Sequence, residues 1–219
     1  MTQPRTYNFD RSPDERRKAE QQIENLKTQL LVAPNDPVKR FFMGKAYRNA
    51  EQIEPAIEHL QKAVSLRPTY GVAHYHLGLA YLEKGNLPKA AEGFAFATEH
   101  KPDLFEAWYW RGHTQNIVGA HAEAAVAFEK VIGEEPEHAQ ALYEGADAYA
   151  AIGNHARASE LYGRAAPFFE NDDELWFRLG TCTLARESWE AAREALKKAQ
   201  ARAERRTDVL NSLGLACAR

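Results

Sequence analysis

Apolar residues in the stretch 71–104 fall on two helical stripes separated by a turn. Counted from Gly71, positions four, seven, eight and eleven share one helix face, and positions twenty, twenty-four and twenty-seven share another. Gly85 suits the turn between the stripes, and Pro102 ends the second helix because proline cannot continue the helical hydrogen-bond ladder. The stretch therefore predicts a hairpin of two facing α-helices.

The same pattern recurs every 34 residues along most of the chain. We call each position within a repeat a slot. The repeats cover residues 37–70, 71–104, 105–138, 139–172, 173–206 and, in part, 207–219. The eighth slot always holds a small residue, namely Gly44, Gly78, Gly112, Ala146, Gly180 and Gly214. The twentieth slot always holds alanine, and the twenty-fourth holds a large residue: Leu60, Phe94, Phe128, Tyr162 and Leu196.

These slots explain how two helices fit together. A small residue where the stripes cross lets the backbones approach, and the large residue of the partner helix fills the space. A lone hairpin leaves apolar surface exposed to water, so neighbouring hairpins must stack to bury it. The pattern therefore predicts an all-α solenoid. Pro167 comes early in its repeat and predicts a shortened second helix there.

The two ends of the array are expected to differ from the middle. Ser12, Pro13 and Glu15 are typical of a helix start, so residues 12–36 are expected to form a helix that shields the first repeat. Residues 1–11 lack periodicity and are expected to be mobile. Residues 207–219 supply only a first helix, which is either a terminal cap or the start of a longer array.

Composition excludes several classes of protein. The chain has 219 residues, 44% of them hydrophobic and 27% charged, and a mean hydropathy of -0.58. No apolar run approaches the roughly 20 residues that a membrane helix needs, and no secretory signal is present, so the cytoplasm is the expected location. A net charge of -3 argues against a general nucleic-acid binder. Cys182 and Cys217 are expected to be free and buried.

The sequence lacks the common catalytic and metal-binding motifs. The sequence has no phosphate-binding glycine loop, no nucleophile elbow and no paired zinc-ligand motif. His74 and His76 are two residues apart on a helix and point to different faces, so we expect structural roles for them. No catalytic residue, metal site or cofactor is predicted.

The residues resemble the tetratricopeptide repeat family, whose signature is W-x2-L-G-x2-Y…A-x3-F…P. In the repeat 71–104 this signature is matched slot by slot, except that His74 replaces tryptophan, while Trp108 and Trp176 occupy that slot later. Arg111 departs from the leucine slot and Gln115 from the tyrosine slot. The resemblance implies a right-handed α-solenoid of antiparallel hairpins whose concave groove binds a peptide or a partner helix.

The resemblance also implies which residues line that groove, because slots two, five, nine and twelve face its concave side in this family. The fifth slot is aromatic five times in succession, in Phe41, Tyr75, Tyr109, Tyr143 and Phe177. These rings either pack within the solenoid or supply contact area for a ligand, and both roles are compatible. Leu79 lies in the ninth slot beside them.

Charges along the expected groove are unevenly distributed. Lys45 and Arg48 lie in the first repeat, with His113 further along. The acidic groove residues lie in the third to fifth repeats and are Glu106, Glu144, Asp147 and Glu174. Such a field would direct acidic groups of a partner to the first repeat and basic groups to the middle, unless the charges are merely solvated. The lysine and asparagine pattern that grips chaperone tails is absent, since Phe41 and Lys45 stand in those slots.

The sequence thus favours a non-catalytic protein–protein interaction scaffold or adaptor whose partner is a protein or peptide of unknown identity. Neither nucleic acid nor membrane is an expected partner. Two alternatives remain open. The chain could be a structural scaffold that assembles with itself through its C-terminal edge, or a regulatory segment of a larger enzyme.

Overall fold

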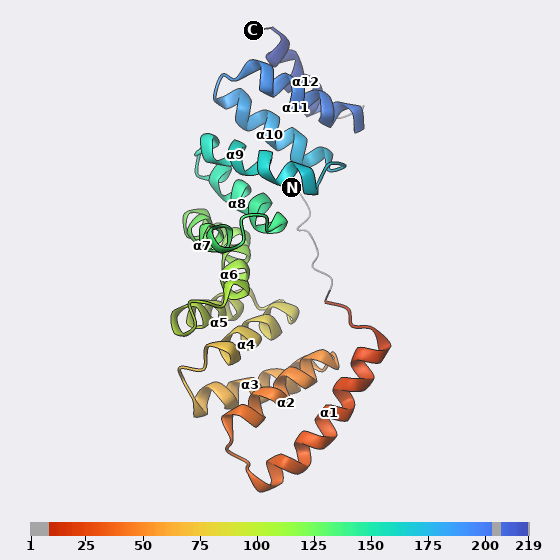
Figure 1. The fold of residues 1–219 in the computed structure, drawn as a ribbon, viewed down its shortest axis with the longest axis vertical. Coiled ribbons are helices and arrows are strands. Elements are labelled where there is room, and N and C mark those ends of the chain that lie inside the picture. The colour runs from red at the N-terminus through yellow and green to blue at the C-terminus, as the bar shows by residue number, and fades with distance from the viewer. Residues whose placement is uncertain (1–8, 203–206, 219) are drawn as a thin grey trace. The chain divides into compact units, whose positions relative to one another are not determined.

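The computed structural model describes residues 9–202 and 207–218, and within these ranges the chain is helical without any β-strand. Most of the segment 1–11, which we expect to be mobile, lies outside the described residues. The chain divides into an N-terminal unit, Met1–Ala107, and a C-terminal unit, Trp108–Arg219. The all-α solenoid class predicted from the repeats is confirmed, and each unit is a stack of helical hairpins (Figure 1).

The N-terminal unit contains a leading helix and two hairpins. Its helices are α1 (Pro13–Val32), α2 (Pro37–Asn49), α3 (Ile53–Leu66), α4 (Gly71–Glu83) and α5 (Leu87–His100), coloured red to yellow-green in Figure 1. Each helix contacts the next one, and α2 also contacts α4. The first helices of neighbouring hairpins therefore lie side by side and form a common face.

The C-terminal unit repeats this arrangement. Its helices are α6 (Phe105–Ile117, which begins just before the unit), α7 (His121–Glu134), α8 (Ala139–Ala151), α9 (His155–Ala165), α10 (Asp173–Ala185), α11 (Trp189–Arg202) and α12 (Thr207–Cys217). From α7 to α12 consecutive helices are in contact, and α10 also contacts α12. After α9 a 3-10 turn, η1 (Ala166–Phe168), contains Pro167, so the shortened helix predicted there is confirmed.

Local sequence explains where α1 begins and how it packs. The Ser12 hydroxyl accepts a hydrogen bond from the Glu15 backbone N–H, and the Glu15 carboxylate accepts one from the Ser12 N–H at 2.9 Å. This capping box satisfies two donors at the helix start. The apolar stripe of α1 is buried, in Ala19, Ile23, Leu26 and Leu30, and packs on Met43 and Ala46 of α2. Burial of this stripe holds α1 on the first hairpin.

Close packing within the hairpins depends on the eighth slot. A Cβ added at Gly44 would lie 2.5 Å from Cγ of Leu60, and one added at Gly180 would lie 2.6 Å from Cγ of Leu196. Both distances are far shorter than a van der Waals contact, so a larger residue would push the helices apart. The predicted pairing of a small eighth slot with a large twenty-fourth slot is confirmed at these positions.

The turns inside the hairpins use two kinds of residue. Three of them place glycine in the left-handed region, at Gly85, Gly119 and Gly153, with φ between 79° and 83°. In the first and last complete repeats the same slot holds Glu51 (φ 59°) and Glu187 (φ 57°). A residue with a Cβ is strained in this conformation by about 1 kcal/mol. These two turns are therefore less favourable than the glycine turns.

The two cysteines differ in their surroundings. Cys182 is buried in α10, as expected, and burial followed by the nearby Asp147 raises its pKa to about 11. Cys217, at the end of α12, is exposed, so the expectation that it is buried is wrong.

Candidate inner binding face

The candidate site is the face made by the first helices of the hairpins, which we call the inner face. In the N-terminal unit it lies on α2 and α4, and in the C-terminal unit on α6, α8 and α10. The predicted groove residues of the N-terminal unit are Phe41, Lys45, Arg48, Tyr75 and Leu79 on α2 and α4, together with Glu106 at the start of α6. Those of the C-terminal unit are Tyr109, His113, Tyr143, Asp147 and Phe177.

The aromatic rings of the fifth slot contribute mainly to packing. Phe41, Tyr109 and Tyr143 are each at most 6% exposed. The Phe41 ring lies 5.3 Å from that of Tyr70, and the Tyr143 ring lies 5.4 Å from that of Phe169. Of the two roles considered for these rings, packing accounts for these three. Tyr75 and Phe177 are only half-buried and leave area that a ligand can contact.

Glu144 is the centre of one polar cluster in the C-terminal unit. The Tyr109 hydroxyl donates to its carboxylate at 2.9 Å, and Nδ1 of His113 is bonded to the other carboxylate oxygen at 2.7 Å. The Asn116 amide donates to the Glu144 backbone carbonyl at 3.0 Å. The Glu144 side chain is only 13% exposed, so these donors replace the water that burial removes. They fix α6 against α8.

Asp147 is the centre of a second polar cluster. Arg178 donates to its carboxylate through Nη1 at 2.7 Å, and the Tyr162 hydroxyl donates to the same oxygen. The Nε of Arg178 donates to Glu174 at 2.9 Å. Burial and the adjacent Asp147 carboxylate both raise the pKa of Tyr162, which therefore remains a donor. Two of the acidic groups expected to attract a basic partner are thus already paired with an arginine of the chain.

Arg178 was not among the residues predicted from the sequence, although its positive charge pairs with both Asp147 and Glu174. It occupies the sixth slot, beside the aromatic fifth slot, and reaches back to the preceding repeat. A search for basic residues about one repeat after each groove carboxylate would have found it. The predicted charge pattern of the groove is therefore neutralised locally at Asp147 and Glu174. Glu106 differs from them because it is exposed.

On the inner face of the N-terminal unit, two arginines lie beside a single buried carboxylate. Glu83, with a side chain only 6% exposed, is paired with Arg11 at 3.0 Å and lies 3.6 Å from Nε of Arg48. Burial lowers the pKa of Arg48, while Glu83 opposes that effect. In the described structure, the buried Nε and Nη1 of Arg48 have no hydrogen-bond partner. Two guanidinium groups here share one carboxylate.

The neighbouring histidines have structural surroundings, as expected. His74 is bonded through Nε2 to the Pro68 carbonyl oxygen at 2.7 Å. His76 is 9% exposed, and its Nδ1 has no hydrogen-bond partner among the described residues. Burial, followed by the charges of Arg48 and Lys45, lowers the pKa of His76 to about 3. His76 is therefore neutral at neutral pH.

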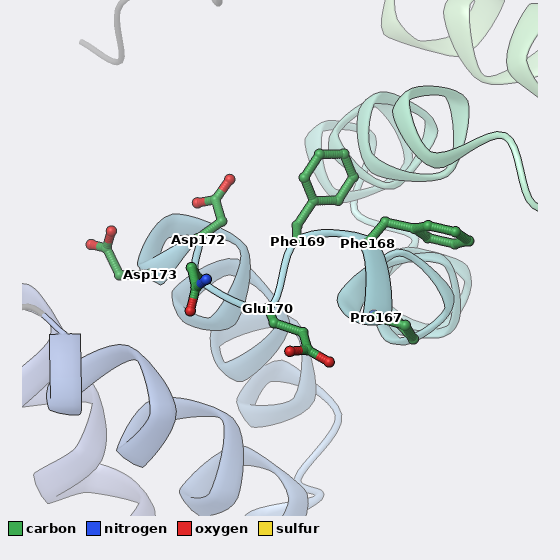
Figure 2. A pocket seen from close by; sticks show the side chains of 7 residues that line it. Pro167, Phe168, Phe169, Glu170, Asp172 and Asp173 are labelled. Carbon is green, nitrogen blue, oxygen red and sulfur yellow. The ribbon is translucent and has the colours of Figure 1, made fainter.

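A depression in the surface lies at the connection from α9 to α10. It has a volume of about 660 Å³ and is lined by residues Pro167, Phe168, Phe169, Glu170, Asn171, Asp172 and Asp173. Figure 2 shows the carboxylates of Glu170, Asp172 and Asp173 pointing in different directions. Because these groups do not converge on one point, the depression is not a strong candidate for a small-molecule site.

The described residues contain no group of three or more histidine, cysteine, aspartate or glutamate side chains placed to hold a metal ion. None of the helices within residues 9–202 and 207–218 combines the length and apolar character needed to cross a bilayer.

Comparison with known proteins identifies the repeats. A family profile described as TPR repeat matches residues 44–85, and one described as tetratricopeptide repeat matches residues 118–176. The chain belongs to the tetratricopeptide repeat family. These matches fall in both units, and the first of them includes Gly44 and Leu60, whose slots interlock. No curated protein sequence matches the chain significantly.

Solved structures of tetratricopeptide repeat (TPR) proteins share the fold. YrrB, described as a TPR protein with an unusual peptide-binding site, is similar with a TM-score of 0.79 at 16% identity, over 87% of this chain and 98% of YrrB. A MamA structure is similar with a TM-score of 0.65 at 21% identity, over 74% and 95% of the two chains. MamA from Desulfovibrio magneticus RS-1 gives 0.65 at 18% identity, over 78% and 98%. At such identities the likeness shows the fold alone.

Proposed function

We propose that this TPR chain is a non-catalytic interaction scaffold that binds an extended peptide or a helix of a partner protein on its inner face. One observation carries the proposal: in both units the first helices of neighbouring hairpins are in direct contact, α2 with α4 and α10 with α12. Several polar groups on these faces are held by hydrogen bonds and ion pairs, at Glu83 in the N-terminal unit and at Glu144 and Asp147 in the C-terminal unit. A surface that is ordered before binding loses little entropy when a partner docks.

The family and fold support this proposal, since YrrB is described as having a peptide-binding site. The accessible groups on the inner face suit a polypeptide. Tyr75 and Phe177 supply partly exposed rings, which give broad contact at low entropic cost, and Lys45 supplies a half-buried charge beside them. Because Asp147 is already paired with Arg178, we no longer expect the acidic residues of that region to attract a strongly basic partner.

Site-specific photo-crosslinking tests the proposal. A benzophenone amino acid would replace Tyr75 or Phe177 on the inner face in the full chain, and the variants would be irradiated in extract of the source cell. Matched controls carry the same group at Phe96 of α5 or Phe168 of η1, which are also aromatic, are 40% and 48% exposed, and lie outside the helices that form this face. We expect a shared partner to crosslink to the inner positions only. Crosslinks confined to Phe96 or Phe168 would refute an inner binding face.

Self-assembly is a second candidate because α12 exposes apolar side chains. Leu210 is 41% exposed and Leu215 is 55% exposed. Such a surface can pair with another copy of the chain. Sedimentation over a range of protein concentrations tests this candidate, since Leu215→Glu should abolish any concentration-dependent increase in mass. A mass that stays monomeric at every concentration would remove self-assembly from consideration.

A further inference from the structure

A segment ahead of the first helix occupies one end of the inner face of the N-terminal unit. Nη2 and Nη1 of Arg11 donate to the two carboxylate oxygens of Glu83 at 3.0 and 3.2 Å. The Arg11 backbone N–H donates to the Glu51 carboxylate at 3.2 Å. The side chains of Arg11 and Glu83 are only 13% and 6% exposed. This two-pronged contact is the arrangement by which proteins recognise a guanidinium group.

Glu83 is a carboxylate that requires a cation. It is the last residue of α4, where the helix dipole disfavours negative charge. Burial increases this need, because an uncompensated buried charge is costly. Arg48 meets the need only partly, since its Nε lies 3.6 Å from Glu83 and its Nε and Nη1 have no hydrogen-bond partner in the described structure.

Because Arg11 and Arg48 share the Glu83 carboxylate, Arg11 can leave this contact. If Arg11 leaves, Glu83 still has Arg48 beside it, and the two unbonded nitrogens of Arg48 can turn to the freed carboxylate. Release of Arg11 therefore does not leave the Glu83 carboxylate without a positive group beside it. Arg11 also precedes the helix cap at Ser12, so its release does not unwind α1.

We propose that Glu83 forms a guanidinium-binding subsite, that Arg11 fills it in the free protein, and that an arginine of the peptide partner displaces Arg11 from it. This inference rests on the proposed function, because the subsite lies on the inner face. The segment Phe9–Arg11 then acts as an internal competitor. A tethered group competes at an effective concentration on the order of millimolar, so it raises the partner affinity that is needed.

The internal occupant also indicates the chemistry of the partner. The Arg11 guanidinium lies over the Phe9 ring, 5.9 Å from its centroid, and its Nη1 donates to the Phe9 carbonyl oxygen. An aromatic residue two positions before an arginine folds the side chain back in this way. The subsite therefore suits a peptide with an aromatic residue followed two positions later by arginine. Lysine suits it less, because it lacks the planar fork.

A labelled peptide with the sequence of residues 7–14 serves as the probe, and fluorescence anisotropy measures its binding to the full chain. The variant Arg11→Ala removes the internal competitor. We expect Arg11→Ala to bind the peptide at least about tenfold more tightly than the unmodified chain, which corresponds to a segment that is docked about 90% of the time. Arg16→Ala is the matched control, since Arg16 is 44% exposed and pairs with Glu51 without contacting Glu83.

Two further measurements identify the contact. A peptide in which citrulline, a neutral isostere, replaces the arginine should lose the gain, and so should the double variant Arg11→Ala/Glu83→Gln. Equal affinity of Arg11→Ala and the unmodified chain, or equal binding of the arginine and citrulline peptides, would mean that Arg11–Glu83 is a structural ion pair only. Crosslinking at Tyr75 and Phe177 is measured with the natural partner, so the proposed function can survive that result or fail independently of it.

Discussion

The inner faces of the two units satisfy their buried charges in different ways. In the C-terminal unit Asp147 takes hydrogen bonds from Arg178 and Tyr162, and Glu144 takes them from Tyr109 and His113. In the N-terminal unit Glu83 is shared between Arg11 and Arg48, and Arg48 keeps two unbonded nitrogens. The same repeat scaffold thus carries a closed polar network in one unit and an exchangeable one in the other.

The residue types in the repeat slots therefore do not by themselves determine where an ion-pair partner on the inner face can be exchanged. In a closed network every donor already has an acceptor, so losing one member leaves a buried group unsatisfied. In the N-terminal unit a spare donor stands next to the shared carboxylate, so one partner can leave at lower cost. We therefore expect rigidity at α8 and α10 and exchange at the α2–α4 end.

Removing one arginine from each unit should give the largest contrast. Arg178→Met keeps the side-chain volume but leaves Asp147 and Glu174 without their counterion, and should destabilise the C-terminal unit by about 3 kcal/mol. Arg48→Met should cost less than about 1 kcal/mol, because Glu83 keeps Arg11 and the substitution removes two buried nitrogens that have no hydrogen-bond partner among the described residues. Native-state hydrogen exchange of amides in α10 and α4 measures both values. Equal losses would contradict the contrast.

Acid should weaken the N-terminal unit through His76. Its pKa is about 3 in the folded protein against an ordinary value of 6.5, so below pH 6.5 the unfolded chain binds a proton that the folded chain does not. Stability is therefore full above that pH and falls as the pH drops toward 3. From about pH 7.5 to about pH 5 we expect a loss of about 2 kcal/mol.

The control for this pH dependence is His76→Gln, which cannot titrate. Urea unfolding at several pH values should show a shallower acid loss for this variant, with the difference arising from His76 alone. Arg48 and Lys45 of α2 are the charges that contribute to the lowered pKa of His76. An identical pH profile for the variant and the unmodified chain would show that His76 is not the titrating group.

Removing one hydroxyl should have a smaller effect on the closed network. Tyr109→Phe deletes the donor to Glu144 and keeps the ring that packs 6.0 Å from Phe128. Because the acceptor is a buried carboxylate, we expect a loss of about 1.5 kcal/mol in thermal or urea unfolding. A change within experimental error would indicate that water replaces the hydroxyl and that this network is less closed than described.

Relief of turn strain should give the smallest effect. Glu187→Gly removes a Cβ at φ 57° and should stabilise the C-terminal unit by up to about 1 kcal/mol. Glu51→Gly relieves similar strain but also loses the contacts to Arg11 and Arg16, so its net effect should be near zero. Melting temperatures of the two variants test this difference, and an equal gain would mean that the Glu51 contacts contribute nothing.

The repeat pattern predicted most of the fold because the interactions that set it are local and periodic. The small eighth slot and the large twenty-fourth slot meet within one hairpin, so their spacing in the sequence is enough to pair Gly44 with Leu60. The start of α1 was predictable for the same reason, since Ser12 and Glu15 cap each other within one turn.

The polar contacts of the inner face were predictable only in part. Arg178 reaches Asp147 from the next repeat, and Arg11 reaches Glu83 from outside the array, so neither pair is fixed by the period of the sequence. Ring burial likewise depends on neighbours. Tyr143 is buried by Tyr162 and Phe169, whereas Tyr75 in the same slot is only half-buried. Which side chain fills a space between repeats is a matter of three-dimensional packing.

Crosslinking yields at the inner positions, compared between the unmodified chain and Arg11→Ala, test the central claim most directly. With the benzophenone group at Tyr75, partner crosslinking should rise when Arg11 is removed, because the exchangeable end of the N-terminal unit becomes free. With the group at Phe177, on the closed network, the yield should stay the same. Equal yields at Tyr75 with and without Arg11, or a partner captured mainly from Phe96, would contradict the account.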